Sequence, residues 1–310
     1  MKLGVIDLGS NTIRLVIYNW NGKKLEKLHN VKRKAQSIKY VHQGIMDQDG
    51  FNVIIETLKE LLMIARIHDT RRINIFATAS LRNIKNTQEA KQTIESAIHH
   101  PIEILDGVDE SLFGFEGMKR TIELPLTGIS VDIGGGSTEI TYFKNKQALQ
   151  AVSLPIGSLN LYMNQVGDVL PTDEEQVAIR KVIRSHLASI PWISHVKVDQ
   201  VIGIGGSVRA IVRIHQARYE LNQSIFDLTL SQNLVHRIAA MFGDDQFQLS
   251  RLILEAVPDR LTTVIPGALI LDELMMAVNA QELRVSSAGL REGYLYTRML
   301  EETSHDSAHH

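Results

Sequence analysis

The stretch Asp132-Ile133-Gly134-Gly135-Gly136-Ser137-Thr138-Glu139 places glycines and hydroxyls between two carboxylates, with a short apolar run on either side. A similar stretch, Asp7-Leu8-Gly9-Ser10-Asn11-Thr12, occurs near the N-terminus, again between apolar runs. Each predicts a hairpin turn with an Asp at the end of a strand. Glycine lets the backbone bring N–H groups close to a ligand, and the Asp is available for a cation or its waters. One such turn is ambiguous, but two indicate a duplicated scaffold that grips a phosphate chain from both sides.

The composition sets limits on the class of protein. A chain of 310 residues exceeds what one hydrophobic core usually fills, so two domains are expected. The N-terminus runs directly into a strand and a charge, which argues against a signal peptide or a membrane span. Zero cysteines exclude disulfides and thiolate metal sites and are consistent with a reducing cytoplasm. The net charge of -2 predicts no general affinity for polyanions, so any anion site must be local.

Strands and helices alternate in both halves, which indicates α/β architecture. In the first half we expect strands at 3–5, 13–20, 25–31, 72–76 and 102–105, and helices at 53–65, 87–98 and 110–120. In the second half we expect a hairpin around Asp132, strands at 147–153 and 201–204, and helices at 172–189, 205–214, 230–241, 246–256, 265–279 and 290–302. Residues 303–310 are expected to form a frayed tail. A crossover at 123–128 predicts domains of 1–124 and 125–310, and a C-terminal helix at about 295–310 is a candidate to pack back on the first.

Four acidic residues are candidates for chemistry. Asp7 and Asp132 each end a strand at a glycine-rich turn, where a carboxylate suits Mg²⁺ or another divalent cation. An ordinary turn cap is the alternative for each, but the repetition favours function. Glu139 and Glu110 are candidates to orient and deprotonate an attacking water. Glu110 equally suits the acidic first turn of a helix, and spacing alone leaves the choice open.

Two further segments could bind phosphate. The turn Gly203-Ile204-Gly205-Gly206-Ser207 lies between a strand and a helix, where N–H groups could hold a phosphate, although tight packing explains it equally well. Between 23 and 39, seven basic residues stand against Glu26 alone. Such a run is usually a solvated hairpin face. Lys32, Arg33 and Lys34 could instead attract a polyanion toward the first Asp turn.

With these residues assembled, the chain resembles the exopolyphosphatase and guanosine pentaphosphate phosphohydrolase (Ppx/GppA) family of the actin-like superfamily. The resemblance rests on residues 4–15, 77–83, 131–139, 203–207 and 289–293 and covers nearly the whole chain. It implies two ribonuclease-H-like domains with the active site in a cleft between them. The chain looks like a short form, because long members continue into an HD-type helical region.

The resemblance also implies roles for individual residues. Glu110 matches the catalytic base, and Asp132 and Glu139 match the acids that hold the metal and position the water. The terminal phosphates would be held by backbone groups of Ser10, Asn11, Gly135, Gly136 and Ser137 and by the side chains of Arg14 and Arg82. Three positions depart from the family pattern: Ser111 replaces the usual Ala, Asn160 stands where many members have Arg, and Thr262 stands where Asp is usual.

The expected activity is Mg²⁺-dependent hydrolysis of terminal phosphoanhydride bonds of inorganic polyphosphate, with release of orthophosphate. Guanosine pentaphosphate is an alternative substrate that no residue excludes. A superfamily kinase or ATPase would instead bind adenosine near residues 203–207, and a non-catalytic polyphosphate or alarmone sensor would bind without turnover. The retained Glu110, Asp132 and Glu139 argue against the sensor. Expected partners are the substrate and a second copy of the chain in a homodimer, with neither nucleic acid nor a membrane.

Overall fold

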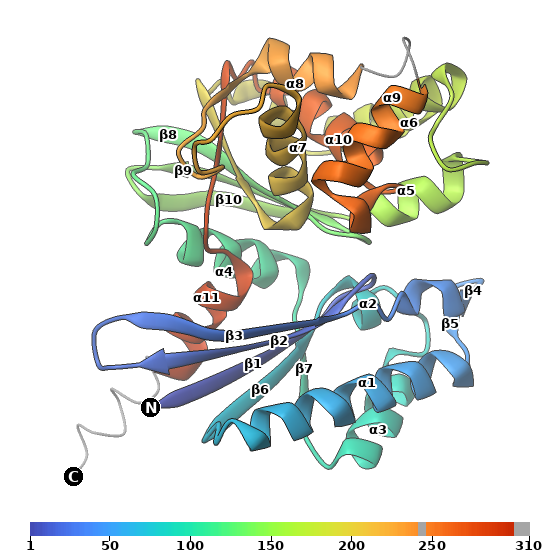
Figure 1. Ribbon diagram of the computed structural model, residues 1–310, viewed down its shortest axis with the longest axis vertical. Helices are drawn as coiled ribbons and strands as arrows, with labels where there is room; N and C mark the ends of the chain where they lie inside the picture. Colours follow the sequence, from blue (N-terminus) through green and yellow to red (C-terminus); the bar gives the residue numbers. More distant parts are fainter. Residues whose placement is uncertain (241–245, 301–310) are drawn as a thin grey trace. The chain divides into compact units, whose positions relative to one another are not determined.

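The computed structural model describes residues 1–240 and 246–300. The chain divides into two compact units, Met1–Gly107 and Val108–His310, and Figure 1 shows the elements of each. The sequence predicted a boundary between residues 124 and 125, so the compact units divide earlier in the chain.

All of the first unit lies within the described residues, and five of its strands form one sheet in the order β3-β2-β1-β6-β7. The strands are β1 (Lys2–Leu8), β2 (Ile13–Trp20), β3 (Leu25–Arg33), β6 (Arg72–Ala77) and β7 (Ile102–Ile104). A separate ribbon pairs β4 (Val41–His42) with β5 (Ile45–Met46). The helices are η1 (Ser37–Tyr40), α1 (Gln48–Ile67), α2 (Ala79–Arg82) and α3 (Thr87–Ile98). The first three strands are antiparallel, and β6 and β7 continue the sheet in parallel to β1.

Helices α1 and α3 cover one face of this sheet (Figure 1). Alternate side chains of β1 and β2, such as Ile6 and Leu15, pack against the apolar stripe of α1, which includes Leu58. Because Asp7 lies between buried Ile6 and Leu8 in the strand, the same alternation puts it on the other face. The packing of α1 therefore determines which way the first Asp points.

In the described part of the second unit, six strands form one sheet in the order β10-β9-β8-β11-β13-β12. The strands are β8 (Thr127–Ile133), β9 (Thr138–Lys144), β10 (Gln147–Leu154), β11 (Gln200–Ile204), β12 (Leu230–Ser231) and β13 (Glu282–Val285). The helices are α4 (Gly107–Met118), α5 (Ser158–Gln165), α6 (Asp173–Ala188), α7 (Gly205–Arg218), α8 (Gln232–Ala239), α9 (Gln246–Ala256), α10 (Val264–Ala277) and α11 (Leu290–Tyr294). Shorter turns are η2 (Ile193–His195), η4 (Pro258–Arg260) and the π-helical η5 (Leu295–Leu300).

Five strands of each sheet repeat one topology, in which an antiparallel hairpin and third strand are extended by two parallel strands. In the second sheet, β12 adds an antiparallel strand at the edge, paired with β13. Strands β1 and β8 each have seven residues, and their Asp is the sixth in both. The pattern of burial is also the same in both strands, with the Asp half-buried between buried neighbours. These features confirm the predicted α/β class and the duplication.

The second sheet has a helical layer on each face. On one face, α7 and α10 pack over alternate residues of β8 such as Val131. On the other face, Phe115 and Met118 of α4 pack against Phe143 of β9 and Ile204 of β11. Helix α4 therefore belongs to the core of the second unit, which gives the physical reason why the compact units divide before it.

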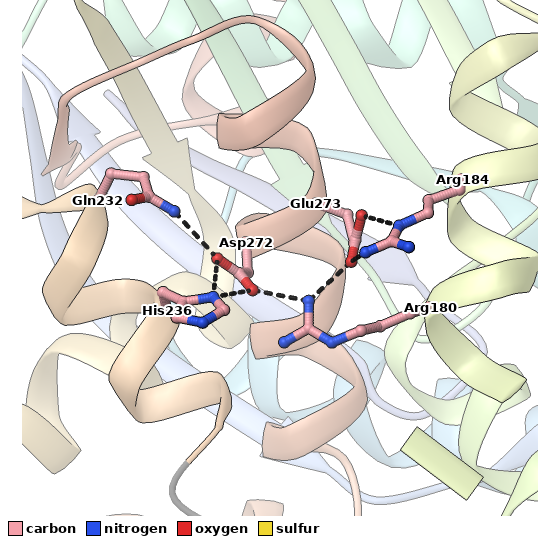
Figure 2. Close-up of polar contacts among 6 residues, drawn as sticks. All are labelled: Arg180, Arg184, Gln232, His236, Asp272 and Glu273. Atoms are coloured by element: carbon pink, nitrogen blue, oxygen red, sulfur yellow. Dashed lines mark hydrogen bonds and ion pairs between the residues drawn. The ribbon is translucent and has the colours of Figure 1, made fainter. Parts of the chain in front are cut away.

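Helix α10 is buried from Val264 to Met275 and carries two adjacent acids, Asp272 (0% exposed) and Glu273 (3% exposed). Figure 2 shows how they are compensated: Arg180 of α6 donates to both, with N–O distances of 2.7 Å. Arg184 adds two hydrogen bonds to Glu273, and its pKa is raised by that carboxylate. His236 lies 3.0 Å from Asp272. These ion pairs fasten α6 and α8 to α10.

The structure differs from the sequence prediction mainly in short elements. Strands β12 and β13 and helix α5 were not predicted, and the helix expected at 230–241 is divided into β12 and α8. The C-terminal helix expected at 295–310 is described only to residue 300, where α11 and η5 pack on α4: the Tyr294 and Phe113 rings lie 5.6 Å apart, edge to face. The tail at 303–310, residue 241 and residues 301–302 lie outside the described residues. Of the described helices, none has the length and apolar character that crossing a membrane requires.

Candidate active site

The β8–β9 hairpin brings two of the predicted acids together. Asp132 and Glu139 are directly paired across the hairpin, so their side chains lie on the same face of the sheet. Glu139 is 4% exposed, and its Oε1 accepts a hydrogen bond of 2.8 Å from Ser153 Oγ on β10. This is the face that α4 covers, since Phe143, four residues beyond Glu139, packs against α4. The two acids therefore occupy one position at the end of the sheet.

Glu110 lies in the first turn of α4 and is 8% exposed. The next residue, Ser111, forms a 2.8 Å hydroxyl–hydroxyl hydrogen bond with Thr141 of β9. Thr141 shares the face of Glu139, because the two are separated by one residue in a strand. The start of α4, with Glu110, is thus tied to the strand that carries Glu139. The Ser111 hydroxyl supplies that tie.

The glycine turn at 134–137 is closed by a hydrogen bond of 2.9 Å from Gly134 N–H to the Ser137 carbonyl. Its carbonyls face the first turn of α5: Gly134 accepts from Ser158 N–H at 2.9 Å, and Gly135 accepts from Leu159 N–H at 3.0 Å. The amide N–H and the carbonyl of a trans peptide point in opposite directions. The N–H groups of residues 135–137 therefore point away from α5, as the predicted phosphate-binding role of Gly135, Gly136 and Ser137 requires.

The third glycine turn lies beside Asp132, because Ile204 of β11 pairs with Asp132 of β8. Gly205 has φ +79°, and a Cβ there would lie 2.2 Å from Asp132 Oδ1. The absence of a side chain at Gly205 thus makes room for the Asp132 carboxylate. Gly205 is the first residue of α7, and Gly206 and Ser207 follow it in the first turn, whose N–H groups favour an anion.

Sequence reasoning missed two arginines in this region. Arg260 Nη1 donates to Ser207 Oγ at 3.2 Å, and a Cβ on Gly206 would lie 2.1 Å from Arg260 Nη2, so the guanidinium covers the turn. Burial lowers the pKa of Arg260 while Asp259 and Asp132 oppose that shift. Burial and the neighbouring Arg291 likewise lower the pKa of Arg209 on α7. The missed arginines are Arg260 and Arg209, to which no sequence motif assigned a role. Arg291 lies in the segment 289–293, which is one of those on which the family resemblance rests.

The first unit repeats the turn geometry with different chemistry. Gly9 N–H donates to the Thr12 carbonyl at 3.1 Å, which is the counterpart of the Gly134–Ser137 bond. Where Asp132 pairs with Glu139, Asp7 pairs with Arg14. The turn is also linked to η1, because the Ser10 carbonyl accepts a hydrogen bond from Ser37 Oγ at 3.4 Å.

Two other predicted phosphate ligands of the first unit are also located. Asn11 Oδ1 is buried without a hydrogen-bond partner in the part of the chain that the structure describes. Arg82 lies at the end of α2, just after β6, and its Nη1 donates to the Leu105 carbonyl at 3.1 Å. The structure thus brings Asp7, Arg14, Ser10 and Asn11 to one hairpin.

Among the three basic residues expected to attract a polyanion, Arg33 pairs with an acidic side chain. Arg33 forms hydrogen bonds of 3.0 Å with both carboxylate oxygens of Glu60 on α1. This pairing raises the pKa of Arg33 and lowers that of Glu60. Lys32 and Lys34 extend the segment on either side of Arg33. Part of the positive charge counted in the sequence is therefore compensated locally.

The donor set at Asp132 and Glu139 fits a magnesium ion better than a transition metal. Within the described residues, no three acidic, His or Cys side chains gather closely enough to form a metal site. Mg²⁺ is usually held by one or two carboxylates together with waters and substrate phosphates. The space that Gly205 leaves beside Asp132 Oδ1 is compatible with such a ligand, and the pair Asp132 and Glu139 could supply the protein's share.

Solved structures share the fold of the whole chain. An exopolyphosphatase from Cytophaga hutchinsonii superposes with a TM-score of 0.86 over 97% of this chain and 98% of that one, at 21% identity. The Aquifex aeolicus member of the Ppx/GppA family superposes with a TM-score of 0.79 over 97% of this chain and 98% of that one, at 23% identity. These similarities confirm the predicted two-domain actin-like fold.

Sequence comparison leads to the same group of proteins. Exopolyphosphatase 1 of Mycobacterium leprae is 24% identical over 308 residues, which cover 96% of this chain and 90% of the relative. Exopolyphosphatase 1 of Mycobacterium tuberculosis is 25% identical over 305 residues, which cover 96% of this chain and 88% of the relative. The Ppx/GppA phosphatase family model matches residues 16–302. The chain therefore belongs to the Ppx/GppA phosphatase family.

Proposed function

We propose that this protein is an exopolyphosphatase, which hydrolyses the terminal phosphoanhydride bond of inorganic polyphosphate and releases orthophosphate. The observation that carries the proposal is the arrangement around Asp132 and Glu139. These paired acids lie at a glycine turn whose N–H groups point away from α5. They are on the face of the sheet that α4, the helix of Glu110, covers. A water-directing acid, metal-binding acids and anion-binding N–H groups are the parts that phosphoryl transfer to water needs.

Each part has a defined role in the proposed reaction. Glu110 accepts a proton from the attacking water and orients it in line with the scissile bond. The N–H groups of residues 135–137 donate to the terminal phosphate, and Arg260 with the start of α7 offsets charge on the phosphate oxygens. When Mg²⁺ is bound by Asp132 and Glu139, it neutralises developing charge on those oxygens. In the first unit, Ser10, Asn11, Arg14 and Arg82 are the proposed phosphate ligands, and Asp7 is a further candidate for the cation.

The position of Arg260 argues against a kinase or ATPase of the wider superfamily. Such an enzyme would need space for adenosine at residues 203–207. Here the guanidinium lies over Gly206 and donates to Ser207, so the turn is equipped for an anion rather than for a nucleobase. Calorimetric titration with ATP should accordingly give no adenosine-dependent gain in affinity over tripolyphosphate.

The proposal is tested by phosphate release from polyphosphate with purified protein and Mg²⁺. We expect release by the wild type and a loss of at least 100-fold in Glu110→Gln, which keeps the size and hydrogen bonding of the side chain but not its basicity. Equal release by Glu110→Gln would refute the assignment of the base. Guanosine pentaphosphate assayed side by side decides the substrate: a higher kcat/KM for it would replace polyphosphate in the proposal.

A further inference from the structure

Three successive carbonyls of the turn at 134–137 accept hydrogen bonds from the first turn of α5, but the donors are of different kinds. The first two, of Gly134 and Gly135, accept backbone N–H groups of α5. The third, of Gly136, accepts from the side chain of Asn160, with Nδ2 3.1 Å from the oxygen. The Gly134 carbonyl also accepts from Ser158 Oγ at 3.1 Å, so the Gly136 carbonyl is the one of the three that a side chain holds without a backbone N–H of α5.

The Asn160 side chain is itself fixed at both ends. Its Oδ1 accepts from Gly157 N–H at 2.7 Å, and its Nδ2 also donates to the Pro155 carbonyl at 3.1 Å. An amide group has one acceptor and two donors, so each of its functions is used here. An arginine at this position would have donors only and could not accept from Gly157 N–H.

The contact matters because of what lies on the other side of the same peptide. When the Gly136 carbonyl is held toward Asn160, the Ser137 N–H must point the opposite way, toward the proposed phosphate position. Gly136 on one side of this peptide loosens its rotation, so the orientation benefits from a restraint. Gly157 lies so close to the turn that a Cβ there would be 2.5 Å from the Gly135 carbonyl, which leaves no room for a side chain at position 157.

We propose that Asn160 is a positioning residue for phosphate binding, which holds the Ser137 N–H toward the substrate. This inference rests on the proposed function of the site. Asn160 carries no charge that could attract the anion. It would raise the affinity for the phosphate chain by orienting the backbone N–H of Ser137.

Asn160→Asp separates this role from helix capping. The Asp keeps an acceptor for Gly157 N–H and an acidic group in the first turn of α5, which is favourable there. Its second oxygen repels the Gly136 carbonyl where Nδ2 had donated. We expect a KM for tripolyphosphate about tenfold higher with kcat nearly unchanged, the scale of one hydrogen bond to a charged group. Asn160→Ala should show the same KM and a lower melting temperature.

Thr172→Ala is the matched control for loss of stability. It removes the side-chain cap of α6, in which Thr172 Oγ1 accepts from Glu175 N–H at 3.2 Å, and α6 contributes no residue to the site. Its melting temperature should fall while its KM stays at the wild-type value. A wild-type KM in Asn160→Asp would overturn the positioning role.

Calorimetric titration with tripolyphosphate in the absence of metal distinguishes this inference from the proposed function. Wild-type binding that Asn160→Asp weakens about tenfold supports the inference even if polyphosphate is not the best substrate. Equal binding by both proteins overturns the inference alone. Absence of binding by the wild type overturns the inference, whereas the proposed function is decided separately by phosphate release in the presence of Mg²⁺.

Discussion

Because Gly205 has no side chain, the Asp132 carboxylate can lie next to its Cα. The Gly205 backbone is left-handed, with φ +79°, and a Cβ would come within 2.2 Å of Asp132 Oδ1. We predict that Gly205→Ala lowers kcat/KM for polyphosphate at least tenfold, because the carboxylate must move from the position in which we propose that it holds the cation. The left-handed backbone adds about 1 kcal/mol of destabilisation. Phosphate release and urea unfolding measure the two effects.

Gly22→Ala is the control for the backbone effect. Gly22 has φ +92° in the turn between β2 and β3, and nothing lies within 4 Å of its Cβ position. This variant should lose about 1 kcal/mol of stability and retain full activity. If the two variants lost activity equally, the argument from the Asp132 contact would be wrong.

At the residue scale, the sequence predicted what local spacing can determine. The pairing of Asp132 with Glu139 follows from a tight hairpin, and Ser137 lies inside the turn itself. Arg260 and Asn160 were not assigned roles, because they reach the glycine turns through the fold and not through neighbouring positions in the chain. From the resemblance, Asn160 was noted only as a departure from an expected arginine. Its hydrogen bond to Gly136 could not be predicted, because that bond depends on where α5 begins.

At the scale of elements, buried charges join α6 to α10. Arg180 donates to both Asp272 and Glu273, which are almost completely buried. We predict that Arg180→Met lowers the free energy of unfolding by about 3 kcal/mol, because it leaves two buried carboxylates short of a partner. The lower end of the usual range applies, since Arg184 still pairs with Glu273 and His236 still contacts Asp272. Urea denaturation measures the loss.

Arg251→Met is the matched control, because it removes an exposed ion pair. Arg251 and Glu255 are exposed and lie one turn apart on α9, with a distance of 3.0 Å. Such pairs contribute little, so the expected loss is below about 0.5 kcal/mol. Equal losses in the two variants would show that burial does not set the strength of the α6–α10 attachment.

The elements that the sequence missed are those with weak periodicity. β13 has four residues, Glu-Leu-Arg-Val, and short strands cannot be told from loops by alternation alone. Helix α5 begins after Gly157 without a Ser, Thr, Asp or Asn cap, so it lacks the usual start signal. By contrast, the Thr172 and Glu175 capping box correctly predicted the start of α6.

At the scale of the whole molecule, the duplication was predictable because each copy of the turn lies in an equivalent hairpin. The division into units was harder to predict, because it depends on which core α4 joins. The sequence at 123–128 has the composition of a linker, yet Phe115 and Met118 already pack in the core of the second unit. Side-chain packing, and not the local composition, decides where the compact units divide.

Two separate cores predict two unfolding events. Leu58 of α1 belongs to the core of the first unit and Leu271 of α10 to that of the second, and both are fully buried. Each Leu→Ala variant should lose about 2–5 kcal/mol. Since units with their own cores unfold independently, scanning calorimetry should show two transitions, with Leu58→Ala lowering one and Leu271→Ala the other. The exposed residues Met63 and Met276 on the same two helices provide controls, whose Ala variants should change neither transition appreciably. One transition lowered equally by both Leu variants would mean that the two units unfold as a single cooperative body.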